Sequence, residues 1–503
     1  MNPLLINGND LTLEHLRLVV YERFPVALAP AAREGVNAAR AVVDKLVSED
    51  RLAYAITTGV GKLSDVRIDP AQNRQLQVNL IRSHSVGVGE PLSQEETRAM
   101  MLLRANSLAK GFSGVRADVI DLLCELLNRG VHPVVPSQGS VGASGDLAPL
   151  AHLALTLIGE GEAVFEDSRV SSAEALKRAG SKPLTLEAKE AISLINGTQA
   201  MLAVGTLALL AAQNMAETAD VLSAMSLDAL RGTVVAFDER IHAARPHAGQ
   251  IKVAANLRRL LAGSEIRASH KDCGRVQDAY SLRCVPQVHG AVRDTLEFCR
   301  KTFEIEMNSA VDNPLVFVNG PAEGDILSGG NFHGEPLAFA LDYLAIALTA
   351  LAGISERRIE RLVNPALNEG LPPFLAADAG LNSGFMMPQV TAAALVSENK
   401  GLAHPASVDS ITTSGNKEDY VSMGMGAAIK LKKVVTNTSY VLGIEACAAA
   451  QALDFLAPLT TSKVLLKAHA AIRQISPEIK QDRVLAGEFA KLAELVRSGS
   501  LAS

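Results

Sequence analysis

Tryptophan is absent from this sequence of 503 residues, and aromatic residues make up only 4% of it. The apolar residues are mainly alanine, leucine and valine, which suits helices that pack closely through small side chains. Hydrophobic residues reach 48% and charged residues 20%. The chain can therefore form a large core, and its composition argues against disorder.

Clusters of one charge are also missing. The formal net charge is -6 and no block rich in lysine and arginine occurs, so we expect no nucleic-acid partner. Residues 1–10 lack the basic segment and the long apolar run of a signal peptide. The longest apolar stretches are 200–212, which is short for a membrane span, and 337–354, which contains Asp342. We therefore expect buried helices and no membrane association.

Cysteine and histidine motifs are equally scarce. The five cysteines form no CxxC motif, so we expect reduced thiols and a cytoplasmic location. The eleven histidines include no HExxH motif, and His242 and His247 are spaced for different faces of a helix. We expect no metal site, and a metal hydrolase has little support.

Helical patterns dominate what is present. Thr12, followed by Glu14, marks a helix start. Residues 54–65 are rich in glycine, threonine and serine and are expected to form a loop. Residues 94–130 have a helical pattern that ends at a glycine. Another apolar helix is expected from about Ala148, after a run of small residues.

The second half of the sequence predicts long helices, several of them apolar on nearly all sides, which implies burial by neighbouring helices or by other subunits. These helices are expected over residues 191–219, 288–307, 336–362 and 423–453. The predicted fold is mainly α, an elongated bundle of long helices with a smaller mixed N-terminal domain. We place that domain at residues 1–200, and the long-helix bundle with a C-terminal helical region at residues 201–503.

A run of small residues between Pro136 and Asp146 is the most informative local feature. Its glycines, Gly139, Gly142 and Gly145, lie three residues apart. A phosphate-binding loop would require lysine at position 146, and a dinucleotide-binding turn would require another glycine spacing. A nucleophile elbow would require glycine at position 146.

A fourth interpretation fits the residue types in this loop. If the backbone nitrogen of Gly145 attacked the carbonyl of Ala143, a five-membered ring would close, and glycine offers no Cβ to obstruct this approach. Loss of water from the ring and from Ser144 would then leave a methylidene group conjugated with the ring. On composition alone, a plain glycine-rich turn remains the commoner explanation.

The segment from Gly142 to His152 (GASGDLAPLAH) resembles the signature of the aromatic amino acid ammonia-lyases and aminomutases. Enzymes of this family make the electrophilic group MIO (4-methylidene-imidazol-5-one) from their own chain. The resemblance implies MIO from Ala143, Ser144 and Gly145, no external cofactor, and a homotetramer with shared active sites. It extends from about residue 5 to 490. Its other motifs begin at Tyr54, Asn196, Val276, Asp312, Ser328 and Glu418.

The resemblance also implies how the substrate is bound. Arg283 would hold the substrate carboxylate with two parallel hydrogen bonds. Tyr280, expected among the catalytic residues, lies three residues earlier and so on the same side of a helix. Asn196 and Gln277 would offer amide hydrogen bonds to the carboxylate or to the ring carbonyl. Outside this family, such residues more often serve surface ion pairs and capping.

Two aromatic residues complete the expected site. Tyr54, which precedes the Gly59–Gly61 loop, matches the tyrosine that the family uses as catalytic acid or base. Phe332 is expected to contact the ring of the substrate. Without the resemblance, both would be interpreted as packing residues.

Two positions indicate the substrate. Ser83-His84 resembles the histidine-specific branch of the family, and Glu418 stands where enzymes for phenylalanine and tyrosine usually carry glutamine. A carboxylate matches an imidazole N–H and is poorly matched to a bare phenyl ring. We therefore expect Glu418 to be catalytic, His84 to bind substrate, and the reaction to convert L-histidine to trans-urocanate and ammonia.

Three neighbouring residues depart from the usual histidine pattern: Val60, Lys417 and Tyr420. A phenylalanine or tyrosine ammonia-lyase or a 2,3-aminomutase therefore stays open as an alternative. An inactive helical oligomeric scaffold is a more remote one, because the intact tripeptide, Tyr54 and Arg283 argue against it.

Overall fold

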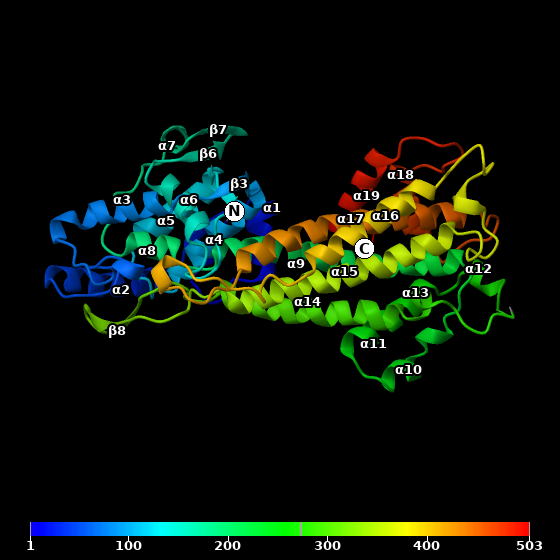
Figure 1. Cartoon of the computed structure of the whole chain (residues 1–503), viewed down its shortest axis with the longest axis horizontal. Coiled ribbons are helices and arrows are strands. Elements are labelled where there is room, and N and C mark those ends of the chain that lie inside the picture. Colours follow the sequence, from blue (N-terminus) through cyan, green and yellow to red (C-terminus); the bar gives the residue numbers. More distant parts are fainter. Residues whose placement is uncertain (1, 272–273, 502–503) are drawn as a thin grey trace. The chain divides into compact units, whose positions relative to one another are not determined.

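The computed structural model describes residues 2–271 and 274–501, and most of them lie in α-helices (Figure 1). This confirms the predicted mainly α fold. The chain divides into two compact units, each discontinuous in sequence. The first comprises Met1–Leu207, Arg300–Leu341 and Pro405–Ile429, and the second comprises Ala208–Cys299, Asp342–His404 and Lys430–Ser503.

The first unit mixes helices with short strands. Its helices are α1 (Leu13–Tyr21), α2 (Pro30–Ser48), α3 (Asn73–His84), α4 (Gln94–Ala109), α5 (Ala117–Arg129), α6 (Leu147–Leu157), α7 (Ser172–Ala179) and α8 (Glu190–Ile195). Its strands are β1 (Leu4–Ile6), β2 (Val26–Leu28), β3 (Val88–Pro91), β4 (His132–Pro133), β5 (Pro136–Gln138), β6 (Glu162–Phe165), β7 (Ser168–Ser171), β8 (Leu315–Gly320) and β9 (Glu323–Leu327). The described strands all belong to this unit.

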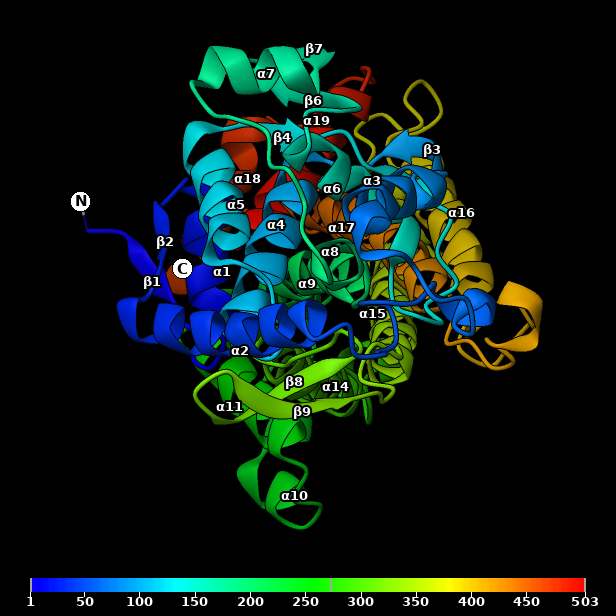
Figure 2. The same cartoon turned by 90° about the vertical axis from the view of Figure 1, so that its left-hand side faces the viewer.

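These strands form small separate sheets. β1 pairs with β2 in parallel, whereas β3–β5, β4–β6–β7 and β8–β9 are antiparallel. The β8–β9 hairpin lies against α2 (Figure 2). Each sheet therefore joins only two or three short strands, and the unit consists mainly of helices.

Four long helices contribute residues to both units: α9 (Gln199–Ala229), α14 (Val285–Met307), α15 (Glu335–Val363) and α17 (Gly424–Asp454). The other helices of the second unit are α10 (Glu239–Ala243), α11 (Ala248–Leu260), α12 (Glu265–Ala268), α13 (Tyr280–Arg283), α16 (Met386–Leu402), α18 (Lys463–Ile475) and α19 (Ala486–Ser498). Within that unit, Arg358 of α15 forms a fully buried ion pair with Glu445 of α17. His289 of α14 contacts Asp220 of α9 at 2.8 Å. These buried pairs connect the helices of the bundle.

Several predicted helix boundaries are confirmed. Thr12 caps α1, since its side chain accepts a hydrogen bond from the His15 amide. Gly130 ends α5 in the left-handed conformation, as expected for a C-terminal glycine. The apolar helix expected from about Ala148 is α6.

Two predicted helices are wrong because each is interrupted. The segment 94–130 is two helices, α4 and α5, separated by a turn in which Gly111 and Gly114 have φ angles of 84° and 68°. The segment 191–219 breaks between α8 and α9 at Asn196-Gly197-Thr198, where Gly197 has a φ of 155°. Helical periodicity continues across both breaks, but such backbone angles are incompatible with a helix.

α9 and α15 are long and apolar enough to cross a membrane by length and composition. However, 72% and 61% of their most apolar windows are buried within the protein. Helices at the core of a large bundle commonly pass this test, so the finding is weak support for a membrane span.

Candidate active site

The loop of small residues lies between β5 and α6. At two of its positions, the backbone conformation and the surrounding atoms leave room only for glycine. Gly142 and Gly145 have φ angles of 69° and 73°. A Cβ atom on Gly145 would lie 2.1 Å from the carbonyl oxygen of Gly197. Gly145 forms a bridge with Gly197, and the Asp146 amide donates to the Gly197 carbonyl at 2.7 Å. The break between α8 and α9 therefore holds this loop.

Ser144 is held through both its side chain and its carbonyl group. Its Oγ donates to Oε1 of Glu418 at 2.7 Å. Its carbonyl oxygen accepts from Nδ2 of Asn196 at 2.7 Å. Three residues that the sequence singled out, far apart along the chain, are thus joined by two hydrogen bonds.

Glu418 occupies a polar setting that favours its ionised form. Burial acts to raise the pKa of Glu418, but hydrogen bonds from Thr413, Ser144 and Ser414 hold that pKa below its ordinary value. The hydroxyls of Thr413 and Ser414 donate to Oε2 at 2.7 and 2.8 Å. Glu418 is therefore a carboxylate at neutral pH.

His84 stands close enough to Glu418 for their charges to interact. Burial lowers the pKa of His84 despite a backbone hydrogen bond and the charge of Glu418. Its Nδ1 lies 2.8 Å from the carbonyl oxygen of Leu80. Because a carbonyl only accepts, we assign the proton to Nδ1, and Nε2 remains an acceptor.

Asp146 follows the tripeptide and is fully buried. Burial raises the pKa of Asp146 to about 6, although the Met201 amide and the Ser140 hydroxyl both donate to its carboxyl group at 2.8 Å. Asp146 thus ties the loop to the first turn of α9. In the sequence, Asp146 served only to exclude other types of loop.

Two further segments close around the loop in the first unit. The Met423 amide donates to the Val141 carbonyl at 2.8 Å, and the Ser422 hydroxyl donates to the Gly142 carbonyl at 3.1 Å. A Cβ on Gly142 would lie 2.2 Å from the Ser422 Oγ. The Gly334 amide reaches the same carbonyl at 3.3 Å, and the partly buried Phe332 lies two residues before it.

Tyr54 lies in the predicted loop, which the structure shows as turns and a short 3-10 helix over residues 61–63. Its hydroxyl accepts a hydrogen bond from the Gly61 amide at 3.1 Å. Tyr54 also lines a cavity of about 640 Å³ with residues of α2, β8 and β9. The loop therefore folds back on its own tyrosine.

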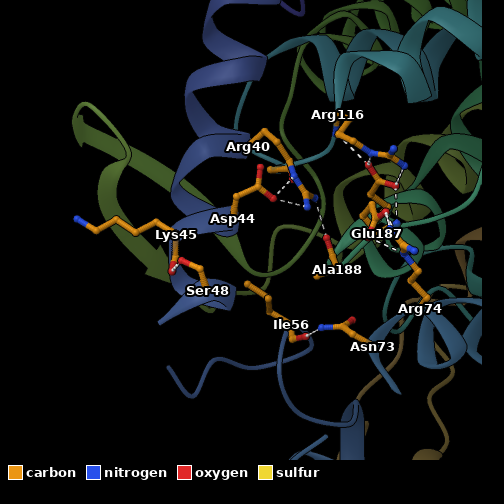
Figure 3. Close-up of polar contacts among 12 residues, drawn as sticks. Arg40, Asp44, Lys45, Ser48, Ile56, Asn73, Arg74, Arg116, Glu187 and Ala188 are labelled. Atoms are coloured by element: carbon orange, nitrogen blue, oxygen red, sulfur yellow. Dashed lines mark hydrogen bonds and ion pairs between the residues drawn. The ribbon is translucent and has the colours of Figure 1, made fainter. Parts of the chain in front are cut away.

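The base of this loop is anchored by polar contacts drawn in Figure 3. Asn73 donates to the Ile56 carbonyl at 3.1 Å. Arg40 of α2 donates to the Ala188 carbonyl at 2.8 Å and pairs with Asp44. Asn73 thus holds the Tyr54 loop at Ile56, and Arg40 connects α2 to the segment before α8.

Of the residues expected near the substrate carboxylate, Gln277, Tyr280 and Arg283 lie in the second unit, whereas Asn196 lies in the first. Tyr280 and Arg283 are the first and last residues of α13, and the Arg283 guanidinium lies 4.6 Å from the centre of the Tyr280 ring. Nε of Arg283 is buried without a hydrogen-bond partner. Gln277 and Tyr280 are exposed. An arginine stacked on a tyrosine keeps its planar donors available for an anion.

Several residues that contact the site were not identified from the sequence, among them Asp146, Thr413, Ser414 and Arg104, which donates to the Asn196 carbonyl at 2.8 Å. Arg104 carried no signal, because a single arginine within a helical pattern is ordinary. Among residues 2–271 and 274–501, no group of three histidine, cysteine or acidic side chains is placed to hold a metal ion.

Comparison with known proteins bears on this geometry. The family model for aromatic amino acid lyases matches residues 11–474. Histidine ammonia-lyase from Koribacter versatilis is 71% identical over all of this chain and 99% of its own length. Among solved structures, histidine ammonia-lyase from Trypanosoma cruzi has a TM-score of 0.92 and 44% identity, covering 99% of this chain and 94% of its own. Tyrosine aminomutase from Streptomyces globisporus has a TM-score of 0.94 and 39% identity, covering 99% and 98%.

The chain belongs to the aromatic amino acid lyase family, and it is an ammonia-lyase.

Proposed function

We propose that this enzyme deaminates L-histidine to trans-urocanate and ammonia with an MIO group formed from Ala143, Ser144 and Gly145. The observation that carries the proposal is the double fixation of Ser144 by Glu418 and Asn196. The residue that would form the electrophile therefore lies next to a carboxylate suited to bind an imidazole.

The residues of the loop fit such a group. The backbone at Gly145 is accessible only to glycine, and its packing on Gly197 leaves no space for a side chain. The Ser144 carbonyl oxygen, which would become the ring carbonyl, already accepts from Asn196. When formed, the group supplies an electron sink for breaking the carbon–nitrogen bond. The other residues bind and orient the substrate and move protons.

Histidine is favoured as substrate by Glu418 and His84. An ionised Glu418 can accept the imidazole N–H of histidine, whereas a phenyl ring would leave the half-buried carboxylate without that partner. Relatives named histidine ammonia-lyase at 71% and 55% identity support this choice.

The remaining roles follow the family. Arg283 would hold the substrate carboxylate with Gln277, Tyr280 would act beside it, and Tyr54 would exchange a proton with the substrate. The unpartnered Nε of Arg283 supports its role. Phe332 would contact the imidazole.

Asn196 has a second atom to offer. Its Oδ1 is buried without a hydrogen-bond partner, while its Nδ2 is used by Ser144. A buried amide oxygen without a donor is costly. An ammonium group of the bound substrate would satisfy it, next to the carbon–nitrogen bond that breaks.

We propose a homotetramer with active sites shared between subunits. Large apolar side chains that remain exposed on α14 and α15, namely Phe298, Tyr343 and Ile346, support association. An isolated monomer would be inactive. A cytoplasmic location is proposed from the cysteine pattern, because the five cysteines form no CxxC motif and reduced thiols are expected.

A substrate panel tests the proposal. L-Histidine, L-phenylalanine and L-tyrosine are incubated with the enzyme, and the conjugated product is followed by absorbance. Urocanate from histidine alone is expected. A cinnamate-type product, or a β-amino acid detected by chromatography, would replace this function with the phenylalanine, tyrosine or aminomutase alternative.

A further inference from the structure

A buried cation without a carboxylate partner lies beside the tripeptide loop. Arg104 of α4 has no exposed surface. Its Nη1 donates to the Asn196 carbonyl at 2.8 Å and to Oε1 of Gln199 at 3.0 Å, while its Nε and Nη2 have no hydrogen-bond partner. Burial lowers the pKa of Arg104 to about 10, so it stays charged at neutral pH.

The carboxylate whose charge acts on Arg104 is already occupied. Asp312 forms a buried ion pair with Lys189 at 3.2 Å and accepts from the Ser113 hydroxyl at 2.9 Å. Asp312 is thus engaged by Lys189, whereas the hydrogen-bond partners of Arg104 are a backbone carbonyl and an amide oxygen. A buried charge that is not balanced is costly for folding, which suggests that it serves another purpose here.

Asn196 connects this cation to the tripeptide. Its backbone carbonyl accepts from Arg104, and its side chain donates to the Ser144 carbonyl oxygen. Arg104 also packs tightly on the corner, since a Cβ added to Gly197 would lie 2.5 Å from Nη1. The guanidinium therefore fixes the residue that contacts the reactive carbonyl.

We propose that Arg104 is a positioning residue that holds Asn196 on the Ser144 carbonyl oxygen and makes the electrophile more reactive through its unbalanced positive charge. This inference rests on the proposed function, because it concerns the ring formed from Ser144. Electron density that the ring accepts gathers on the oxygen conjugated with the methylidene, which is the Ser144 carbonyl oxygen. A fixed positive charge in a water-excluded setting favours that shift.

The same helix offers a matched control. Arg98 of α4 is also buried, donates to the Leu127 and Val19 carbonyls, and has its pKa lowered to about 10 by burial. It contacts none of the residues around the tripeptide in these hydrogen bonds. Arg98→Met therefore removes a buried guanidinium without touching the proposed network.

The experiment measures the electrophile without substrate. Intact-protein mass is measured for the wild type, Arg104→Met, Arg104→Lys and Arg98→Met. It gives the fraction of each protein that contains the ring. The rate at which borohydride bleaches the ring absorbance is then recorded. We expect Arg104→Met to slow bleaching by roughly tenfold to a hundredfold, as for other residues that act through a neighbour. Arg104→Lys should recover part of the rate, and Arg98→Met should bleach at the wild-type rate.

Each outcome of this experiment either supports or overturns the proposed role of Arg104. An Arg104→Met protein that keeps the open-chain mass, while Arg98→Met matures, also supports the proposal, because the corner is then needed to form the ring. Equal bleaching rates in wild type and Arg104→Met, or equal slowing in Arg98→Met, would overturn it. If Arg104→Met does not fold, Arg104→Gln removes the charge while keeping donors and is measured likewise. A wild-type protein without the ring would instead refute the proposed function.

Discussion

Two buried arginines, one in each unit, differ in whether a carboxylate balances their charge. Arg358 in the second unit is paired through Nε and Nη2 with Glu445, which also accepts from Ser226 and Ser355. Arg104 in the first unit has only a backbone carbonyl and an amide as partners. A balanced pair holds helices together, whereas the unbalanced cation lies where negative charge is expected during the reaction. The contrast separates a structural polar cluster from a functional one.

The largest expected effect comes from removing the electrophile. Ser144→Ala leaves no hydroxyl to eliminate, so turnover of histidine should fall by more than about 10⁴-fold, as when a covalent catalytic group is deleted. The thermal unfolding midpoint of the whole protein should stay near the wild-type value. Steady-state rates and calorimetry on the same preparation check both. Retained turnover would mean that the small-residue loop is only structural.

Glu418→Ala should follow closely. The variant loses the proposed imidazole partner and proton carrier, and histidine turnover should fall by about 10²- to 10⁴-fold. Ring content, measured by intact mass, separates lost catalysis from lost maturation. Unchanged histidine kinetics would remove Glu418 from the site. The neighbouring Lys417→Ala serves as control and should change turnover little.

In the second unit the effect should fall on stability. Glu445→Ala leaves Arg358 buried without its carboxylate, which costs about 3–5 kcal/mol. The unfolding midpoint should drop, while KM for histidine in the remaining folded enzyme stays near the wild-type value. A large change in KM with an unchanged midpoint would erase the distinction between the two regions.

The pH dependence of stability tests the loop. The pKa of Asp146 is raised to about 6 in the folded protein from an ordinary 3.8, so the native state retains a proton that the unfolded chain loses. Its contribution to stability is present below about pH 4 and is lost as pH rises through about 6. Asp146→Asn should therefore gain stability relative to wild type over this interval. If the free energies of unfolding of wild type and Asp146→Asn changed in parallel from pH 4 to 7, the raised pKa of Asp146 would be contradicted.

The smallest effect is expected at Tyr420, one of the departures from the usual histidine pattern. Its exposed ring stacks on His333 with centroids 6.1 Å apart. Tyr420→His should change the specificity constant for histidine by no more than about twofold, because exposed substitutions usually cost within about 0.5 kcal/mol. A large gain in histidine turnover would show that this position tunes the substrate.

Apolar periodicity allowed the helical fold to be predicted, because it is a local property of the sequence. The tripeptide in the loop before α6 was singled out by the resemblance to the family, since composition alone favoured a plain glycine-rich turn. The resemblance also singled out Ser144, Asn196 and Glu418, but not the hydrogen bonds that join them. The breaks at 110–116 and 196–198 were missed, since helical periodicity continues through them. Arg104 could not be identified from the sequence, because its proposed role depends on its burial without a carboxylate as hydrogen-bond partner.

The proposed deamination of histidine depends on closure of Ala143, Ser144 and Gly145 into a ring. Intact-protein mass of active enzyme, with the fragment containing these residues mapped by peptide mass, tests it most directly. We expect a chain lighter than the encoded one by two waters, with both losses in that fragment. An enzyme that turns over histidine at the full encoded mass would contradict it.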